Sequence, residues 1–163
     1  MEEQTHGSEI LTLDRDIDQL LRTLYASISF AEGDEPDWQG MAALFVESAQ
    51  VTRMTPERTD YLHLPGFQDF AREMLETGAY TSFFEREVGR SVHCYGDAAH
   101  VWSAYETKSS ESAKRAFGHG VNSIQLVREQ STWRILSLLW DERPSATPLR
   151  LAQVLAGKVV LHG

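Results

Sequence analysis

The chain has 163 residues and a formal net charge of −9, with 42% hydrophobic and 24% charged residues. These values are ordinary for one globular domain that buries a substantial core. The acidic balance disfavours nucleic acid and anionic membranes as partners, because both bind a basic protein face. The single cysteine, Cys94, excludes an internal disulfide.

The N-terminal residues do not resemble a secretory signal. The N-terminal residues MEEQTHGSEI are acidic and polar, without the apolar stretch of a secretory signal. No apolar run reaches the roughly 18 residues of a membrane span. We therefore expect a cytoplasmic protein that does not associate with membranes.

Helical patterns occupy the first half of the chain. Residues 1–11 are expected to form a flexible tail. Apolar residues then recur at spacings of three and four from Ile17 to Ile28, which predicts an amphipathic helix. A second, short helix is predicted from Trp38 to about Glu47.

After this helix, residues 50–54 alternate in polarity and predict a short strand, and residues 55–60 predict a loop. Leu64-Pro65-Gly66 introduces a third helix with an apolar stripe from Phe67 to Leu75. Gly78 is a suitable C-terminal stop for that helix, since glycine adopts the left-handed conformation of a helix cap readily.

The second half of the chain predicts strands. Four long segments are rich in β-branched and aromatic residues and are separated by turn signals such as Tyr95-Gly96-Asp97. Short connections of this kind join antiparallel neighbours, so the segments predict a meander. The predicted strands are residues 83–95, 98–108, 117–128 and 132–140. Residues 144–163 are expected to form a C-terminal tail with one weakly amphipathic stretch, residues 149–155.

Helices followed by a meander indicate an α+β fold rather than a parallel sheet. Long strands twist, and a sheet of such strands must curl. The first helix has one strong apolar stripe and is suited to the inside of the curl. We therefore predict N-terminal helices packed in the concave face of a strongly curved antiparallel sheet.

Three motifs resemble the nuclear transport factor 2-like superfamily. They are LFVESAQV at residues 44–51, AHVWSAYE at residues 99–106 and VREQSTWRI at residues 127–135. The superfamily includes ketosteroid isomerase, scytalone dehydratase and SnoaL-type polyketide cyclases. The resemblance implies a cone-shaped, cystatin-like domain over residues 12–143, and it is closest to members without an assigned reaction.

The resemblance also implies where catalytic groups would lie. In the isomerases a general-base aspartate follows the first strand's A-x-V pattern, and the matching position here is Arg53. A guanidinium cannot abstract a proton, so isomerase chemistry by the known route is not expected. Tyr25 is placed like the oxyanion donor on the first helix. The second donor position falls near His119 or Gly120.

The resemblance and strand alternation together select residues for an internal pocket. The resemblance to the isomerases implies that Asn122 shares the pocket face of its strand with Gly118 and Gly120, and alternation places His119 on the opposite face. Asn122 could hold a ligand oxygen or pair with a neighbouring side chain, and Tyr25 could hold a ligand or bond to backbone. The predicted pocket residues are Tyr25, Arg53, Tyr105, Asn122, Leu138 and Trp140.

Glu87 is the candidate catalytic acid or base, if it lies inside the curved sheet with a raised pKa. It shares a strand face with Glu85, and the alternative is a solvated strand end with cross-strand ion pairs. Arg53 would hold an anionic group of the ligand. His93 and His100 lack the spacing of metal ligands, so we expect neither a metal nor a cofactor.

The last predicted strand bears on the oligomeric state. Leu136, Leu138 and Trp140 alternate with Ile135, Ser137 and Leu139, which makes both of its faces apolar. Both faces should therefore be covered, one by the helices and the other by a second copy of the chain. We expect a homodimer formed through the sheet.

The sequence leaves three functions open. The first is binding of a small apolar or carbonyl-containing ligand in the pocket. The second is an isomerase, dehydratase, cyclase or hydrolase acting on such a ligand. The third is a domain for assembly or protein interaction without chemistry.

Overall fold

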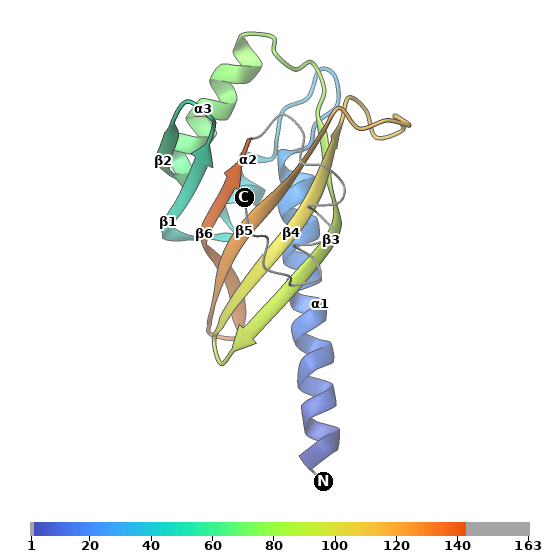
Figure 1. Cartoon of the computed structure of the whole chain (residues 1–163), viewed down its shortest axis with the longest axis vertical. Coiled ribbons are helices and arrows are strands. Elements are labelled where there is room, and N and C mark those ends of the chain that lie inside the picture. Colours follow the sequence, from blue (N-terminus) through green and yellow to red (C-terminus); the bar gives the residue numbers. More distant parts are fainter. Residues whose placement is uncertain (1, 143–163) are drawn as a thin grey trace, which may run out of the picture.

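The computed structural model describes residues 2–142. The tail predicted for residues 144–163 lies outside the described residues. Within the described part, three helices precede or interrupt six strands (Figure 1). The elements are α1 (Glu2–Ile28), α2 (Trp38–Ala42), β1 (Phe45–Met54), β2 (Thr59–His63), α3 (Leu64–Glu76), β3 (Phe84–Tyr95), β4 (Ala98–Lys108), β5 (Gly118–Glu129) and β6 (Thr132–Asp141).

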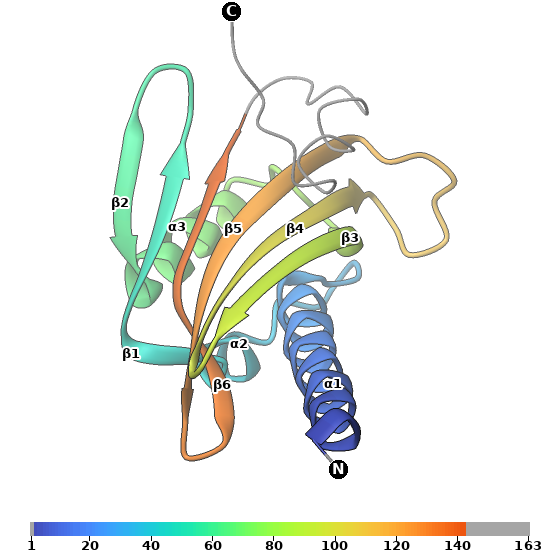
Figure 2. The same ribbon diagram turned by 60° about the horizontal axis from the view of Figure 1, so that its bottom comes forward.

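The six strands form one sheet in the order β2-β1-β6-β5-β4-β3 (Figure 2). Strands β3 to β6 are the predicted antiparallel meander, and β3, β4 and β5 bend strongly along their length. The sheet is not antiparallel throughout, because β1 pairs with β6 in parallel. The predicted α+β fold with a curved sheet is confirmed.

Helix α1 supplies the apolar face that its spacing predicted. Ile17, Leu21, Leu24 and Tyr25 are buried against the sheet. The helix begins at Glu2, although we expected a flexible tail to residue 11. Residues 2–11 contain no proline and several good helix formers, so nothing stops the helix from continuing toward the N-terminus. Among the described residues, no helix combines the length and apolarity needed to cross a bilayer.

The structure corrects the predicted region between α1 and α3. Helix α2 ends at Ala42 rather than near Glu47, and β1 begins at Phe45. The backbone N–H of Ile135 on β6 donates to the carbonyl of Leu44 at 2.8 Å, so pairing with the sheet ends the helix early. Strand β2 was not predicted. It is a short edge strand whose pairing with β1 orders part of the expected loop.

A bulge changes the predicted faces of β6. Gln125 pairs with Ser137 and Leu126 pairs with Ile135, so Leu136 has no partner on β5. Ile135 and Leu138 therefore both face the helices, at 0% and 8% exposure, while Leu136 is 38% exposed. Strict alternation had placed Leu136 with Leu138, and Ile135 on the opposite face; both placements are wrong.

Candidate functional site

A cavity of about 710 Å³ lies between the three helices and the concave face of the sheet. This volume is within the range of roughly 300–1,000 Å³ that is common for small-molecule sites. Its walls are mainly apolar and include Phe30, Phe45, Phe67, Phe70, Phe83 and Phe117. Each residue predicted for the pocket lines this cavity: Tyr25, Arg53, Tyr105, Asn122, Leu138 and Trp140.

One wall of the cavity contains a chain of hydrogen bonds. The side-chain amide of Asn122 donates to the Tyr25 hydroxyl at 3.1 Å, and that hydroxyl lies 2.7 Å from the Ser103 hydroxyl. Ser103 donates in turn to the carboxylate of Glu87. Asn122, Tyr25 and Ser103 are at most 5% exposed, so the bonds between them are shielded from water.

The charged residues at the outer end of this series of hydrogen bonds determine which groups donate and which accept. Arg90 donates to Glu87 Oε1 at 2.7 Å and to Asp18 Oδ1 at 2.8 Å. A carboxylate only accepts, so the Ser103 proton points to Glu87 and the Tyr25 proton points to Ser103. Burial also raises the pKa of Tyr25, which keeps the phenol protonated. Tyr25 is therefore engaged by side chains rather than by backbone, and its proton is directed away from the cavity.

Glu87 is not among the residues that line the cavity. Its side chain is 14% exposed and forms an ion pair with Arg90. It lies instead along an open groove between α1 and β3, together with Asp18 and Arg90. The structure thus connects Glu87 to the cavity only through Ser103 and Tyr25, and the ion pair named as the alternative for this glutamate is present.

Glu85, on the same strand as Glu87, does line the cavity, and we had not selected it from the sequence. Its carboxylate has no hydrogen-bond or ion-pair partner among residues 15–142, whose side chains the structure describes. Burial raises the pKa of Glu85 from 4.5 to about 8. Its backbone is held in place by the Ser29 hydroxyl, which accepts from the Glu85 N–H at 3.0 Å.

Tyr105 is the diagonal neighbour of Glu85 on the next strand. Glu85 pairs with Thr107 and Glu87 pairs with Tyr105, so the side chains of Glu85 and Tyr105 share the concave face. Burial raises the pKa of Tyr105, and the negative charge of Glu85 raises it further. No hydrogen bond from the Tyr105 hydroxyl is present in the described part of the chain.

Glycine at position 120 makes room for this tyrosine. A Cβ atom on Gly120 would lie 2.3 Å from the Tyr105 hydroxyl oxygen, which is far inside contact distance. The indole Nε1 of Trp38 also has no hydrogen bond within the described residues, but it is buried and is not exposed to the cavity. The unpaired polar groups on the otherwise apolar walls are therefore those of Glu85 and Tyr105.

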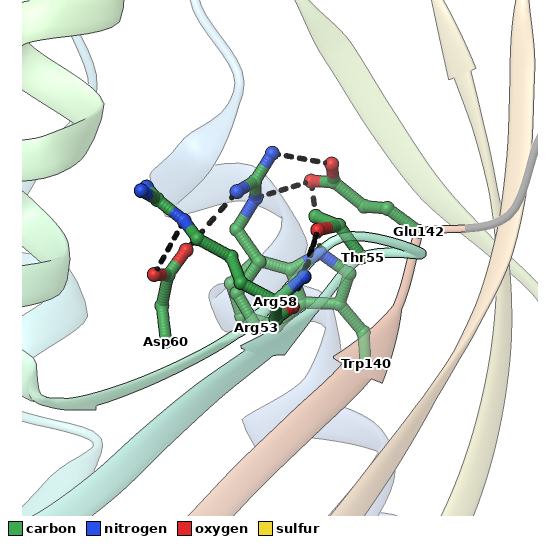
Figure 3. A network of polar contacts seen from close by, with 6 residues as sticks. All are labelled: Arg53, Thr55, Arg58, Asp60, Trp140 and Glu142. Atoms are coloured by element: carbon green, nitrogen blue, oxygen red, sulfur yellow. Dashed lines mark hydrogen bonds and ion pairs between the residues drawn. The ribbon is translucent and has the colours of Figure 1, made fainter.

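Arg53 lies at one edge of the cavity, where it joins three strand ends (Figure 3). Its Nε and Nη2 donate to the two oxygens of Glu142 at 2.9 and 2.7 Å, and its Nη1 donates to Asp60 at 3.1 Å. The guanidinium also lies 5.1 Å from the ring centre of Phe70. Two carboxylates already neutralise Arg53, which argues against the anion-holding role that we predicted for it.

The same carboxylates form a wider network at this edge (Figure 3). The indole N–H of Trp140 donates to Glu142 Oε1 at 3.2 Å, and Arg58 contacts the other oxygen of Asp60 at 2.9 Å. Among residues 15–142, no group of three or more histidine, cysteine, aspartate or glutamate side chains is arranged to hold a metal ion.

Comparisons with known proteins identify the fold. No family model matches the chain, and no curated protein is similar to it in sequence. Its structure resembles a cystatin-like protein of unknown function from Nostoc punctiforme, with a TM-score of 0.62, 13% identity and coverage of 83% of this chain and 94% of that one. An NTF2-like protein with a cystatin-like fold from Novosphingobium aromaticivorans has a TM-score of 0.58, 15% identity and coverage of 91% and 94%.

A third similar structure is Aln2 from a Streptomyces species, with a TM-score of 0.58, 18% identity and coverage of 81% of this chain and 91% of that one. At these identities the likeness establishes the fold alone. The chain has the cystatin-like fold found in NTF2-like proteins of unknown function, as the sequence motifs implied.

Proposed function

We propose that the protein binds a small, largely apolar, ring-containing molecule in the cavity between the helices and the sheet. The observation that carries this proposal is the cavity itself, whose walls are apolar and aromatic apart from a few polar groups. Small-molecule sites usually combine such walls with a few polar groups that orient the ligand. Tyr105 and Glu85 would have this orienting role.

Aromatic walls favour rings over flexible chains. Burying apolar surface contributes about 25 cal/mol per Å², and edge-to-face ring contacts add about 0.5–1.5 kcal/mol each. The walls already contain such contacts, because the Phe67 and Trp140 rings meet edge to face with centroids 5.7 Å apart. A planar or alicyclic ligand would extend this packing.

A ligand panel tests the proposal. We would screen aromatic and alicyclic compounds by thermal shift and confirm binders by native mass spectrometry. A compound present at about 100 times its Kd should stabilise the fold by about 2.7 kcal/mol, equivalent to roughly 5–10 °C in Tm.

Two tryptophan substitutions on neighbouring surfaces provide matched variants. Ala71 lines the cavity from α3, so Ala71→Trp should fill part of it and weaken binding at least tenfold. Ala79 is exposed and does not line the cavity, so Ala79→Trp should bind like the parent. Equal binding by both variants, or no binder in a broad panel, would reject the proposal.

A second candidate function is proton transfer on a carbonyl compound bound in the same cavity. The observation in its favour is Glu85, an unpaired carboxyl whose pKa of about 8 suits a general acid or base near neutral pH. A ketone that binds should then exchange hydrogen with D2O at the carbon next to its carbonyl. Proton NMR would detect this exchange, and Glu85→Gln should abolish it without preventing binding.

A further inference from the structure

The charged groups around the cavity are unevenly balanced. Four acidic residues line it, and Arg53 is the only lysine or arginine that does so among the described residues. Arg53 is already bound to Glu142 and Asp60, and His119 on the lining is exposed. The described lining therefore offers no uncommitted arginine or lysine to an anionic ligand. The acidic residues of the lining are Glu57, Glu85, Asp141 and Glu142.

Glu85 is the lining carboxyl whose pKa burial raises, and no positively charged group pairs with it among residues 15–142. From α1 it faces Tyr25, and from β4 it faces Tyr105 and Thr107, none of which carries a positive charge. Glu85 also borders the open groove between α1 and β3, but the arginines there are paired with other carboxylates. Arg22 pairs with Asp18, Arg86 with Glu106, and Arg90 with Glu87 and Asp18. A buried carboxylate is stable only when a positive group or hydrogen-bond donors compensate it.

The walls near Glu85 are also suited to a cation. Phe30 and Phe83 form an isolated β-bridge directly beside it, and Phe83 meets Tyr80 and Phe117 in an aromatic cluster with ring centroids 5.4 and 6.2 Å away. The faces of aromatic rings attract ammonium groups, by about 0.5–1 kcal/mol at exposed sites. Tyr80 and Phe117 are exposed, so their contribution falls in this lower range. An acid that shares a cavity with aromatic rings therefore offers both a counter-charge and favourable walls to an amine.

We propose that the ligand of this cavity is a hydrophobic amine whose protonated nitrogen is held by the Glu85 carboxylate. The inference rests on the proposed function, which it narrows to one chemical class. The ammonium group donates to Glu85, and the Tyr105 oxygen beside it accepts a further hydrogen bond. The ring system of the amine fills the phenylalanine-lined part of the cavity.

The amine should show a pH dependence that a neutral ligand cannot show. Burial keeps Glu85 protonated in the empty cavity below a pKa of about 8. Binding an ammonium group requires the carboxylate, so a proton leaves Glu85 on binding. The affinity should then rise about tenfold per pH unit between pH 6 and pH 8. A ketone or alcohol that accepts a hydrogen bond from the protonated acid should bind equally at pH 6 and 7.

Three probes of similar shape distinguish a site for an amine from a site for a neutral or an anionic ligand. They are naphthylethylamine, naphthylethanol and naphthylacetate. Their Kd values would be measured by isothermal titration calorimetry with the full chain at pH 6, 7 and 8. Glu85→Gln removes the counter-charge while preserving the shape of the side chain. The control is Glu73→Gln, because Glu73 is an exposed residue on α3 that does not line the cavity and its replacement changes the net charge equally.

We expect the amine to bind at least tenfold more tightly than the alcohol at pH 8, and the acetate to bind most weakly. Glu85→Gln should remove the preference for the amine and its pH dependence, whereas Glu73→Gln should retain both. If the alcohol binds as tightly as the amine, or if Glu85→Gln keeps the preference, the inference is overturned while the proposed function stands. If no probe binds, both are overturned.

Discussion

The pH dependence of stability should reveal Glu85 without any ligand. Burial raises the pKa of Glu85 from 4.5 to about 8. Between these two values the folded protein holds a proton that the unfolded chain has released. Stability should therefore fall as the pH rises through this window, by about 1.4 kcal/mol per pH unit from this one group. Over the whole window the loss is on the order of 4–5 kcal/mol.

Replacing Glu85 with glutamine removes this titration. The amide cannot ionise, so the free energy of unfolding of Glu85→Gln should lack this contribution at every pH. At pH 5 the variant should be less stable than the parent by about 1–3 kcal/mol, since a buried amide without partners replaces a protonated acid. By pH 8 the order should reverse, because the unfolded parent chain has released the Glu85 proton that the folded protein tends to retain, whereas the glutamine variant has no such titration.

Urea unfolding at pH 5, 6, 7 and 8, followed by tryptophan fluorescence, measures this difference. Taking the difference between the variant and the parent cancels the groups that titrate equally in both proteins. Glu73→Gln controls for the lost surface charge. A difference between Glu85→Gln and the parent that stays constant from pH 5 to pH 8, within about 0.5 kcal/mol, would refute the burial argument for this carboxyl.

Three further predictions concern other parts of the structure. Gly120→Ala should destabilise the fold by about 1–3 kcal/mol in urea titrations, because the added carbon would lie 2.3 Å from the Tyr105 hydroxyl oxygen. The control Gly66→Ala should not destabilise it, because the added carbon would lie 3.7 Å from its nearest neighbour. Ser103→Ala should cost about 1–3 kcal/mol by leaving the Tyr25 proton without its acceptor, and Ser103→Ala should cost much less when Tyr25 is already phenylalanine. We also expect a homodimer through the sheet, which light scattering would report as twice the chain mass of 18.4 kDa.

Much of the architecture follows from local patterns. The stripe from Ile17 to Ile28 predicted the buried face of α1, and β-branched and aromatic runs predicted β3 to β6 to within one residue at each end. Alternation along β5 correctly placed Asn122 toward the cavity, whereas His119, which it placed on the opposite face, is exposed but still contributes to the cavity lining. These features depend on the period of a helix or strand, which the sequence states directly.

Other boundaries depend on contacts between distant segments. Leu44 and Phe45 suit a helix as well as a strand, and pairing with β6 decides the outcome. Strand β2 has only a weak alternation of its own and exists through its bonds to β1. The bulge at Leu136 cannot be seen in a pattern of alternating residues, because it is a mismatch in register between two strands.

For the candidate site, too, some features follow from the sequence and others only from the tertiary structure. The sequence by itself determined that Glu85 and Glu87 lie on one strand and that their side chains share a face. Only the tertiary structure decided which carboxyl would enter the cavity. Asp18 and Arg90 lie beside Glu87 because α1 crosses β3 there, and they compensate its charge. Glu85, two residues away, meets aromatic rings instead, and its different chemistry comes from that surrounding alone.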